Sequence, residues 1–176
     1  MAKAAANKKL HGLTKNERLC NFSLKKLLFE QGDVFKVYPF HIYWKIIDAN
    51  LEDIFFAKSP TLYKGNATSS ILKQQNPSWP LKKVSSNALF YYPVKCLLGV
   101  SKRSHKKAVT RNHVKRLMKE AYRKNKIPFY DFLENQNMLC LLAIVYTSKI
   151  HMSYHELEKK ILVSLQKLQQ EIQKIT

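Results

Sequence analysis

Basic side chains recur at intervals of four residues within the segment from residue 101 to residue 126, SKRSHKKAVTRNHVKRLMKEAYRKNK. Residues four apart lie on one face of an α-helix, so this spacing predicts a continuous cationic ridge. Like charges at that spacing destabilise an isolated helix by about 0.2–0.5 kcal/mol per pair, and a bound polyanion would relieve the repulsion. The pattern therefore favours contact with the phosphates of a nucleic acid over an ordinary solvated helix face. The residues concerned are Lys102, Arg103, Arg111, Asn112, Lys115, Arg116, Lys119 and Arg123.

The overall charge indicates the same class of partner. The 176 residues include 31 lysines and arginines against 12 aspartates and glutamates, which gives a formal net charge of +19. No acidic residue lies between Asp53 and Glu120, so most of the ridge belongs to a stretch without carboxylates. Such a stretch suits a phosphate backbone, because each nearby carboxylate would repel the ligand.

No set of residues suited to catalysis is visible in the sequence. The four glycines are too far apart to form a phosphate-binding loop, and the carboxylates are scarce and dispersed. His151 and His155 are four apart but lack a third ligand, so a surface pair is favoured over a zinc site. Cys20, Cys96 and Cys140 have no CxxC spacing, which argues against a disulfide scaffold or a cysteine-built zinc site and favours a reducing cytoplasm.

A small sheet covered by helices is expected to position the ridge. The run MLCLLAIVY, at 138–146, is apolar on both faces and is predicted to be a central strand. The predicted strands are 34–47, 95–101 and 138–146, and the predicted helices are about 23–31, 106–124 and 154–172. The fold class is therefore an α/β (α+β) two-layer sandwich, in which three helices cover a small mixed sheet of about four strands.

Particular residues predict the helix ends and the buried stripes. Ser23 is expected to cap the first helix, and Gly32 to end it in the left-handed conformation. Ser153 and Glu156 form a capping box before the last helix. The predicted stripes are Leu24, Leu27 and Leu28 in the first helix, Val114, Leu117, Met118 and Ala121 with Tyr122 at the margin in the second, and Leu157, Ile161, Leu165, Leu168 and Ile172 in the third.

A single domain is expected from residue 13 to residue 176, preceded by a basic, disordered tail at 1–12. Residues 49–91 contain three prolines and six serines and show little periodicity, so they are predicted to be an insertion. The first residues lack the apolar segment of a signal peptide, and no apolar run is long enough to cross a bilayer. No membrane association is therefore expected.

The cationic segment also resembles a known signature. Its pattern Ala108-x-x-Arg111-Asn112-x-x-Lys115-Arg116-x-x-Lys119-Glu120, entered from a strand that ends Gly99-Val100-Ser101-Lys102-Arg103, resembles that of the bacterial ribonuclease P protein subunit. The resemblance extends over most of the chain and includes Arg18-Leu19, Phe29 with Gly32, and the aromatic strand around Phe40 and Tyr43. Two features differ from the family: His113 stands where a third basic residue, Arg, is common, and the insertion at 49–91 replaces a short turn.

The resemblance implies a fold and a division of labour. The fold would contain a left-handed strand–helix–strand crossover, and the protein would pair with a catalytic RNA that removes the 5′ leader from precursor tRNA. The RNA would hold Mg²⁺ and carry the chemistry, so no catalytic residue is expected in the protein and no obligate protein partner. The ridge residues would bind the RNA subunit, while Lys25, Phe29 and Tyr43 would bind the single-stranded leader. Plain core packing is the alternative for Phe29 and Tyr43.

Two other functions are compatible with the charge. A structural RNA-binding protein, such as a ribosomal protein with an α/β sandwich, would also be basic and lack catalytic residues. Peripheral membrane binding through the basic helix would require bulky apolar residues free to insert, and the periodicity assigns those residues to the core. The spacing of the motif favours the ribonuclease P hypothesis over both.

Overall fold

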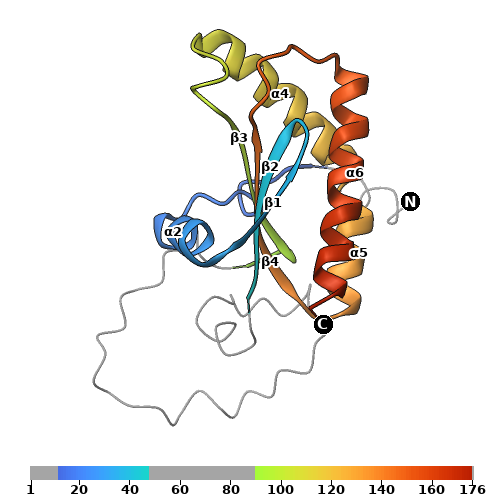
Figure 1. Cartoon of the computed structure of the whole chain (residues 1–176). Coiled ribbons are helices and arrows are strands. Elements are labelled where there is room, and N and C mark those ends of the chain that lie inside the picture. The colour runs from blue at the N-terminus through green and yellow to red at the C-terminus, as the bar shows by residue number, and fades with distance from the viewer. Residues whose placement is uncertain (1–11, 48–89, 176) are drawn as a thin grey trace, which may run out of the picture.

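A four-stranded sheet lies at the centre of the computed structural model, which describes residues 12–47 and 90–175 (Figure 1). Helices pack on both of its faces. In chain order the elements of these residues are α2 (Phe22–Gln31), β1 (Asp33–Val37), β2 (Phe40–Ile47), β3 (Val94–Val100), α4 (Ala108–Asn125), α5 (Ile127–Asn135), β4 (Leu139–Tyr146) and α6 (Tyr154–Gln173). The predicted class, a mixed sheet with helices in an α+β arrangement, is confirmed.

The strand order is β1-β2-β4-β3. The pairs β1/β2 and β2/β4 are antiparallel, whereas β3 and β4 are parallel neighbours connected through α4 and α5. Seven of the eight residues of β4 are buried, in agreement with the prediction that this strand is central. Both faces of β4 are covered because helices lie on each side of the sheet.

The segment 34–47 was predicted as one strand, and this is wrong. It is the hairpin β1–β2, with the turn at Tyr38 and Pro39, and Val37 pairs with Phe40. The physical reason is local, because Pro39 has no N–H to donate to a ladder and favours a turn. Within β2 the predicted alternation is confirmed: Phe40, Ile42 and Trp44 are buried, and the residues between them are half-buried.

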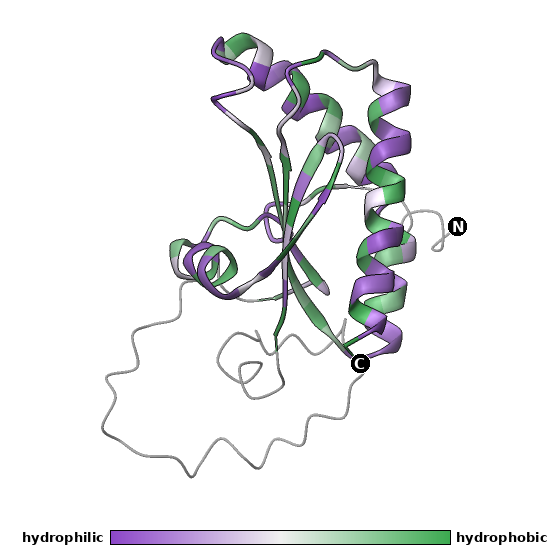
Figure 2. Cartoon of the chain, viewed as in Figure 1, coloured by the Kyte–Doolittle hydropathy of each residue, from purple (hydrophilic) through white to green (hydrophobic). Residues whose placement is uncertain are grey.

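Two apolar clusters hold the layers together. On one face, α4, α5 and α6 pack against side chains of the sheet that include Phe40, Ile42 and Ile144. On the other face, α2 packs through Leu24 and Leu28. Strands β3 and β4 are predominantly hydrophobic, whereas the β1–β2 hairpin and the helices α4 and α6 combine hydrophobic and hydrophilic residues (Figure 2). The buried stripes of the three predicted helices are confirmed, except that Leu27 and Leu117 are only half-buried and Tyr122 is fully buried.

Two predicted ends of α2 are corrected by the structure. Asn21, not Ser23, caps the helix, because its Oδ1 accepts a hydrogen bond from the Leu24 amide at 3.1 Å. Gly32 does end the helix, but its φ of −86° and ψ of 154° are extended rather than left-handed. A glycine is needed there for space: a Cβ on Gly32 would lie 2.3 Å from the carbonyl oxygen of Leu28. The capping box of Ser153 and Glu156 at α6 is confirmed.

Helix α5 was not predicted. It follows α4 after a single residue, Lys126, and buries Phe129, Tyr130 and Leu133. Pro128 stands in its first turn, a position that favours helix initiation, and this was the available sequence signal. Helix α5 extends the layer that covers β4 on the α4–α6 side.

The segment 12–21 lies along the outer edge of β3, a contact that was not predicted from the sequence. Arg18 forms a parallel bridge with Cys96. The Leu19 amide donates to the Cys96 carbonyl at 2.9 Å, and the Cys96 amide donates to the Glu17 carbonyl at 2.7 Å. These bonds occupy backbone groups at an otherwise open sheet edge.

Most of the predicted tail, 1–12, and most of the predicted insertion, 49–91, fall outside the described residues. Within those that are described, no helix is long and apolar enough to cross a membrane. The three cysteines are free thiols.

Candidate nucleic-acid interface

Helix α4 presents its predicted cationic side to solvent. Val114, Met118 and Ala121 are buried against the rest of the fold, and the charged positions lie on the opposite side of the helix. Asn112, Arg116 and Lys119 are exposed; Arg111, Lys115 and Arg123 are half-buried; and Lys102 and Arg103 are exposed in the turn before the helix. The structure therefore brings together the α4 members of the predicted set on one surface, here called the basic face (Arg111, Asn112, Lys115, Arg116, Lys119 and Arg123).

Two arginines of the basic face have internal partners. Nη1 of Arg111 donates to the carbonyl oxygens of His105 and Lys106, at 3.0 and 2.5 Å, so this side chain closes the loop before α4. Nη2 and Nε of Arg123 donate to the Glu120 carboxylate at 2.6 and 2.9 Å. The hydrogen bonds from Arg123 lower the pKa of Glu120, which keeps this carboxylate ionised.

The other cations of the predicted set have no such internal partners. Within the described residues, the side chains of Lys115, Arg116 and Lys119 make no hydrogen bond or ion pair, and the same holds for Lys102 and Arg103. Adjacent like charges without counter-charges are what a surface for phosphate groups requires. The start of α4 adds to this, because Lys107 provides no side-chain cap and the first turn has no acidic residue.

The predicted leader residues lie on the other side of the sheet, around α2. The rings of Phe29 and Tyr43 meet edge to face, with centroids 5.0 Å apart. Phe29 is 46% exposed and Tyr43 is half-buried, so plain core packing does not describe the Phe29 side chain. Lys25 lies one helical turn before Phe29 and is half-buried.

A hollow of about 470 Å³ continues from Tyr43 across this side of the sheet. It is lined by His41, Tyr43, Ser101, Arg103, Ser104, Val145, Thr147 and Lys149. Arg103 was predicted to act with the basic face, but the structure groups its side chain with Tyr43. His41 and Lys149 were missed; the strand alternation that places His41 on the same face as Tyr43 was the signal for the first, and nothing local indicated the second.

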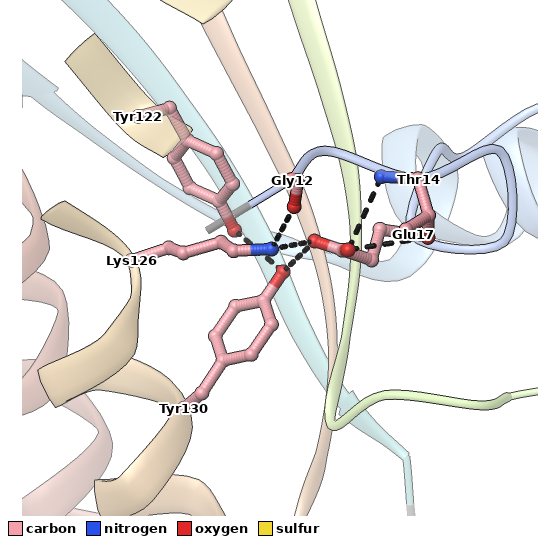
Figure 3. A network of polar contacts seen from close by, with 6 residues as sticks. All are labelled: Gly12, Thr14, Glu17, Tyr122, Lys126 and Tyr130. Carbon is pink, nitrogen blue, oxygen red and sulfur yellow. Dashed lines mark hydrogen bonds and ion pairs between the residues drawn. The ribbon is translucent and has the colours of Figure 1, made fainter. Parts of the chain in front are cut away.

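A buried polar network lies at the junction of α4 and α5 and joins residues far apart in the chain (Figure 3). The Glu17 carboxylate is paired with the Lys126 ammonium, and the two side chains are 0% and 1% exposed. The same carboxylate accepts hydrogen bonds from the Tyr130 hydroxyl at 2.9 Å and from the amide and hydroxyl of Thr14 at 3.2 and 3.1 Å. Because every partner is satisfied, the network fixes the segment 12–17 against the junction of α4 and α5.

Two of the three cysteines are buried thiols, and Cys20 is exposed. Burial raises the pKa of the Cys96 thiol far above its usual range and that of Cys140 to about 12, so both stay protonated. No group of three or more His, Cys, Asp or Glu side chains among these residues could hold a metal ion. The exposed cations of the basic face suit phosphate groups, and the exposed ring of Phe29 offers a surface for stacking.

The fold and the exposed cationic helix define a basic α+β domain with separate charged and aromatic surfaces. A model of the Ribonuclease P family matches residues 55–169, more than half of the chain, and the chain therefore belongs to this family. The match includes the basic face and the turn before it. It begins after β2, so Lys25, Phe29 and Tyr43 lie outside it.

Curated relatives carry the corresponding name. Proteins of Porphyromonas gingivalis strains ATCC 33277 and W83, each named "Ribonuclease P protein component", are 35% identical over 69 residues, which is 39% of this chain and 50% of each relative. The matched region thus spans about half the length of these curated relatives.

Proposed function

We propose that this chain is the protein subunit of ribonuclease P. It binds the catalytic RNA and the 5′ leader of precursor tRNA, and it promotes endonucleolytic removal of that leader while the RNA carries the chemistry. Membership of the family supports this assignment. The observation that carries it is the row of unpaired cations on α4, namely the half-buried Lys115 and the exposed Arg116 and Lys119, because all three lie within the matched region.

The basic face is the proposed contact with the RNA subunit. Phosphate contacts position a protein on a folded RNA without requiring a particular base sequence. Arg111 takes part differently from its neighbours, because its guanidinium already bonds two backbone carbonyls and therefore shapes the loop that leads into α4. Lys102 extends the cationic surface at the start of the helix.

The Phe29–Tyr43 pair and the hollow beside it are the proposed leader site. Unpaired bases stack on aromatic rings without sequence preference, and nearby cations bind the backbone that connects them. Lys25 and Arg103 flank the two rings from α2 and from the turn after β3. A single strand in this site would thus meet both rings and cations, which are the two kinds of contact that non-specific recognition uses.

Mg²⁺ belongs to the RNA in this proposal. The donor sets of the described residues do not fit a metal centre of the protein, so the protein's part is to bind and orient. We further propose that the complex acts in the cytoplasm, where the free thiols would stay reduced.

The test is cleavage of precursor tRNA by the cognate RNA subunit at low Mg²⁺, with and without the protein. The protein is expected to accelerate turnover, and equal turnover in both reactions rejects the assignment. The double variant Arg116→Gln/Lys119→Gln should lose most of the acceleration. The control Lys160→Gln/Lys167→Gln removes the same amount of charge from exposed positions of α6 and should retain the acceleration.

The leader site has a separate test. Phe29→Ala should reduce the preference of the assembled enzyme for precursor over mature tRNA by about fivefold or more, since stacking on one base contributes roughly 1–3 kcal/mol. Assembly with the RNA subunit should be unchanged. A variant that weakens assembly but keeps the preference would show that Phe29 is part of the fold and not of the leader site.

A further inference from the structure

A second hollow, of about 320 Å³, lies between the segment 12–21 and the outer side of α4. Its lining is Leu13, Arg18, Arg116, Lys119, Glu120 and Arg123. Arg18 is separated from the α4 residues by almost a hundred positions and lies outside the region that matches the family. We call this hollow the Arg18 groove.

Positive charge dominates both walls of the groove. Four of the six lining residues are cations, and the one carboxylate, Glu120, is neutralised by its ion pair with Arg123 at 2.6 Å. Arg18 is exposed, and within the described residues its side chain has no ion pair or hydrogen bond. Cations that face one another across a gap repel, and an anion between them removes that repulsion.

The wall that carries Arg18 is rigidly placed. Glu17, the preceding residue, is held by the buried ion pair with Lys126, which itself follows the last residue of α4 (Figure 3). Arg18 pairs with Cys96 of β3, and the amide of Leu19 bonds the Cys96 carbonyl. The backbone of Arg18 is therefore fixed relative to α4 before any ligand binds, which reduces the entropy lost on binding.

We propose that the Arg18 groove holds the phosphodiester backbone of an RNA strand, with Arg18 as a binding residue opposite Arg116 and Lys119. The inference rests on the proposed function and adds to it a second wall for the RNA contact. A guanidinium offers paired donors that match two phosphate oxygens, so arginines on both walls suit this ligand. A peptide is not favoured, because Leu13 is the only apolar lining residue and side-chain pockets are lacking.

The salt dependence of RNA binding tests the groove directly. The probe is the cognate ribonuclease P RNA, and its affinity for the full chain is measured from about 0.05 to 0.4 M salt. Loss of one phosphate contact lowers the slope of log affinity against log salt by about 0.7–0.9, which is roughly a five- to eightfold loss of affinity at about 0.1 M salt. Arg18→Gln should show this change, and Arg18→Lys should keep most of the slope.

The matched control is Lys15→Gln, which removes the same charge from an exposed residue of the same segment that does not line the groove. Its slope should stay close to that of the unmodified chain. The proposal that the Arg18 groove binds RNA is rejected if Arg18→Gln and the unmodified chain have equal slopes. It is also rejected if Arg18→Gln and Lys15→Gln change the slope equally.

The two proposals fail in different ways. If the unmodified protein binds the RNA and accelerates cleavage, but Arg18→Gln keeps the full slope, only the groove is wrong. If the unmodified protein neither binds this RNA nor accelerates cleavage, both proposals are rejected. Thermal unfolding of each variant checks that the slopes are measured on folded proteins. The unfolding curves should match that of the unmodified chain, because both substituted side chains are exposed.

Discussion

Replacing Lys126 by Met should destabilise the protein by about 3–5 kcal/mol, because it leaves the Glu17 carboxylate buried without its counter-charge. Glu17 and Lys126 are 0% and 1% exposed, so solvent cannot replace the lost ammonium. The hydroxyl of Tyr130 and the two donors of Thr14 would remain, but neutral donors compensate a buried charge only in part.

Removing both charges separates this effect from a simple loss of packing. In the double variant Glu17→Gln/Lys126→Met no charge is buried. The amide oxygen of the glutamine can still accept from both donors of Thr14, and its NH2 group can donate to the Tyr130 hydroxyl oxygen. Neutral replacements of a buried pair are often tolerated, so the double variant should be more stable than Lys126→Met alone. A recovery of about 2 kcal/mol is expected.

Urea unfolding followed by far-UV circular dichroism at pH 7 measures these differences. Lys174→Met is the control, because Lys174 pairs with Glu171 at 2.7 Å on the surface and exposed pairs contribute at most about 1 kcal/mol. The reasoning is refuted if Lys126→Met is no more harmful than Lys174→Met. It is also refuted if the double variant is as unstable as the single one.

Three further predictions concern single residues. Glu120→Gln should strengthen binding of ribonuclease P RNA by about two- to eightfold in a filter-binding assay, because it removes a carboxylate beside the RNA surface and releases Arg123; weaker binding would contradict this. Gly32→Ala should lower the free energy of unfolding by about 2 kcal/mol or more, because the new Cβ would clash with the Leu28 carbonyl. Urea unfolding measures this as a lower midpoint, and an unchanged midpoint would contradict the prediction. Burial lowers the pKa of His105, which is 6% exposed, so the imidazole binds a proton more readily in the unfolded chain than in the folded one, and the free energy of unfolding should fall as the pH drops below about 6.5. His105→Phe should make this fall smaller in urea titrations at pH 7 and 5.5. A fall as large as in the unmodified chain would exclude His105 as its source.

Features that depend on residues close together in the chain were predictable. The four-residue spacing of charges placed the basic face on one helix, and Ser153 with Glu156 predicted the start of α6. The run MLCLLAIVY predicted the central strand. In each case the information lies within a few turns of helix or one strand, because periodicity and capping are local properties.

The places where prediction failed have equally definite causes. The hairpin β1–β2 was taken as one strand because alternation continues on both sides of Pro39. Helix α5 is short, and its buried residues fall too close to those of α4 to stand out as a separate pattern. At Gly32, the need for a glycine comes from the nearby Leu28 carbonyl and not from a left-handed backbone, which only the packed structure reveals.

By itself the sequence determined that this protein is basic, that it mixes helices with a small sheet, and that one helix presents a row of cations. Only the tertiary structure decided which distant residues join that row. Arg18 lies beside α4 because its neighbour Glu17 pairs with Lys126. Arg103 lies near Tyr43 because it follows β3, and β4 lies between β3 and β2 in the sheet. The Glu17–Lys126 pair links residues 109 positions apart. No local periodicity predicts such contacts, because they follow from how the layers pack.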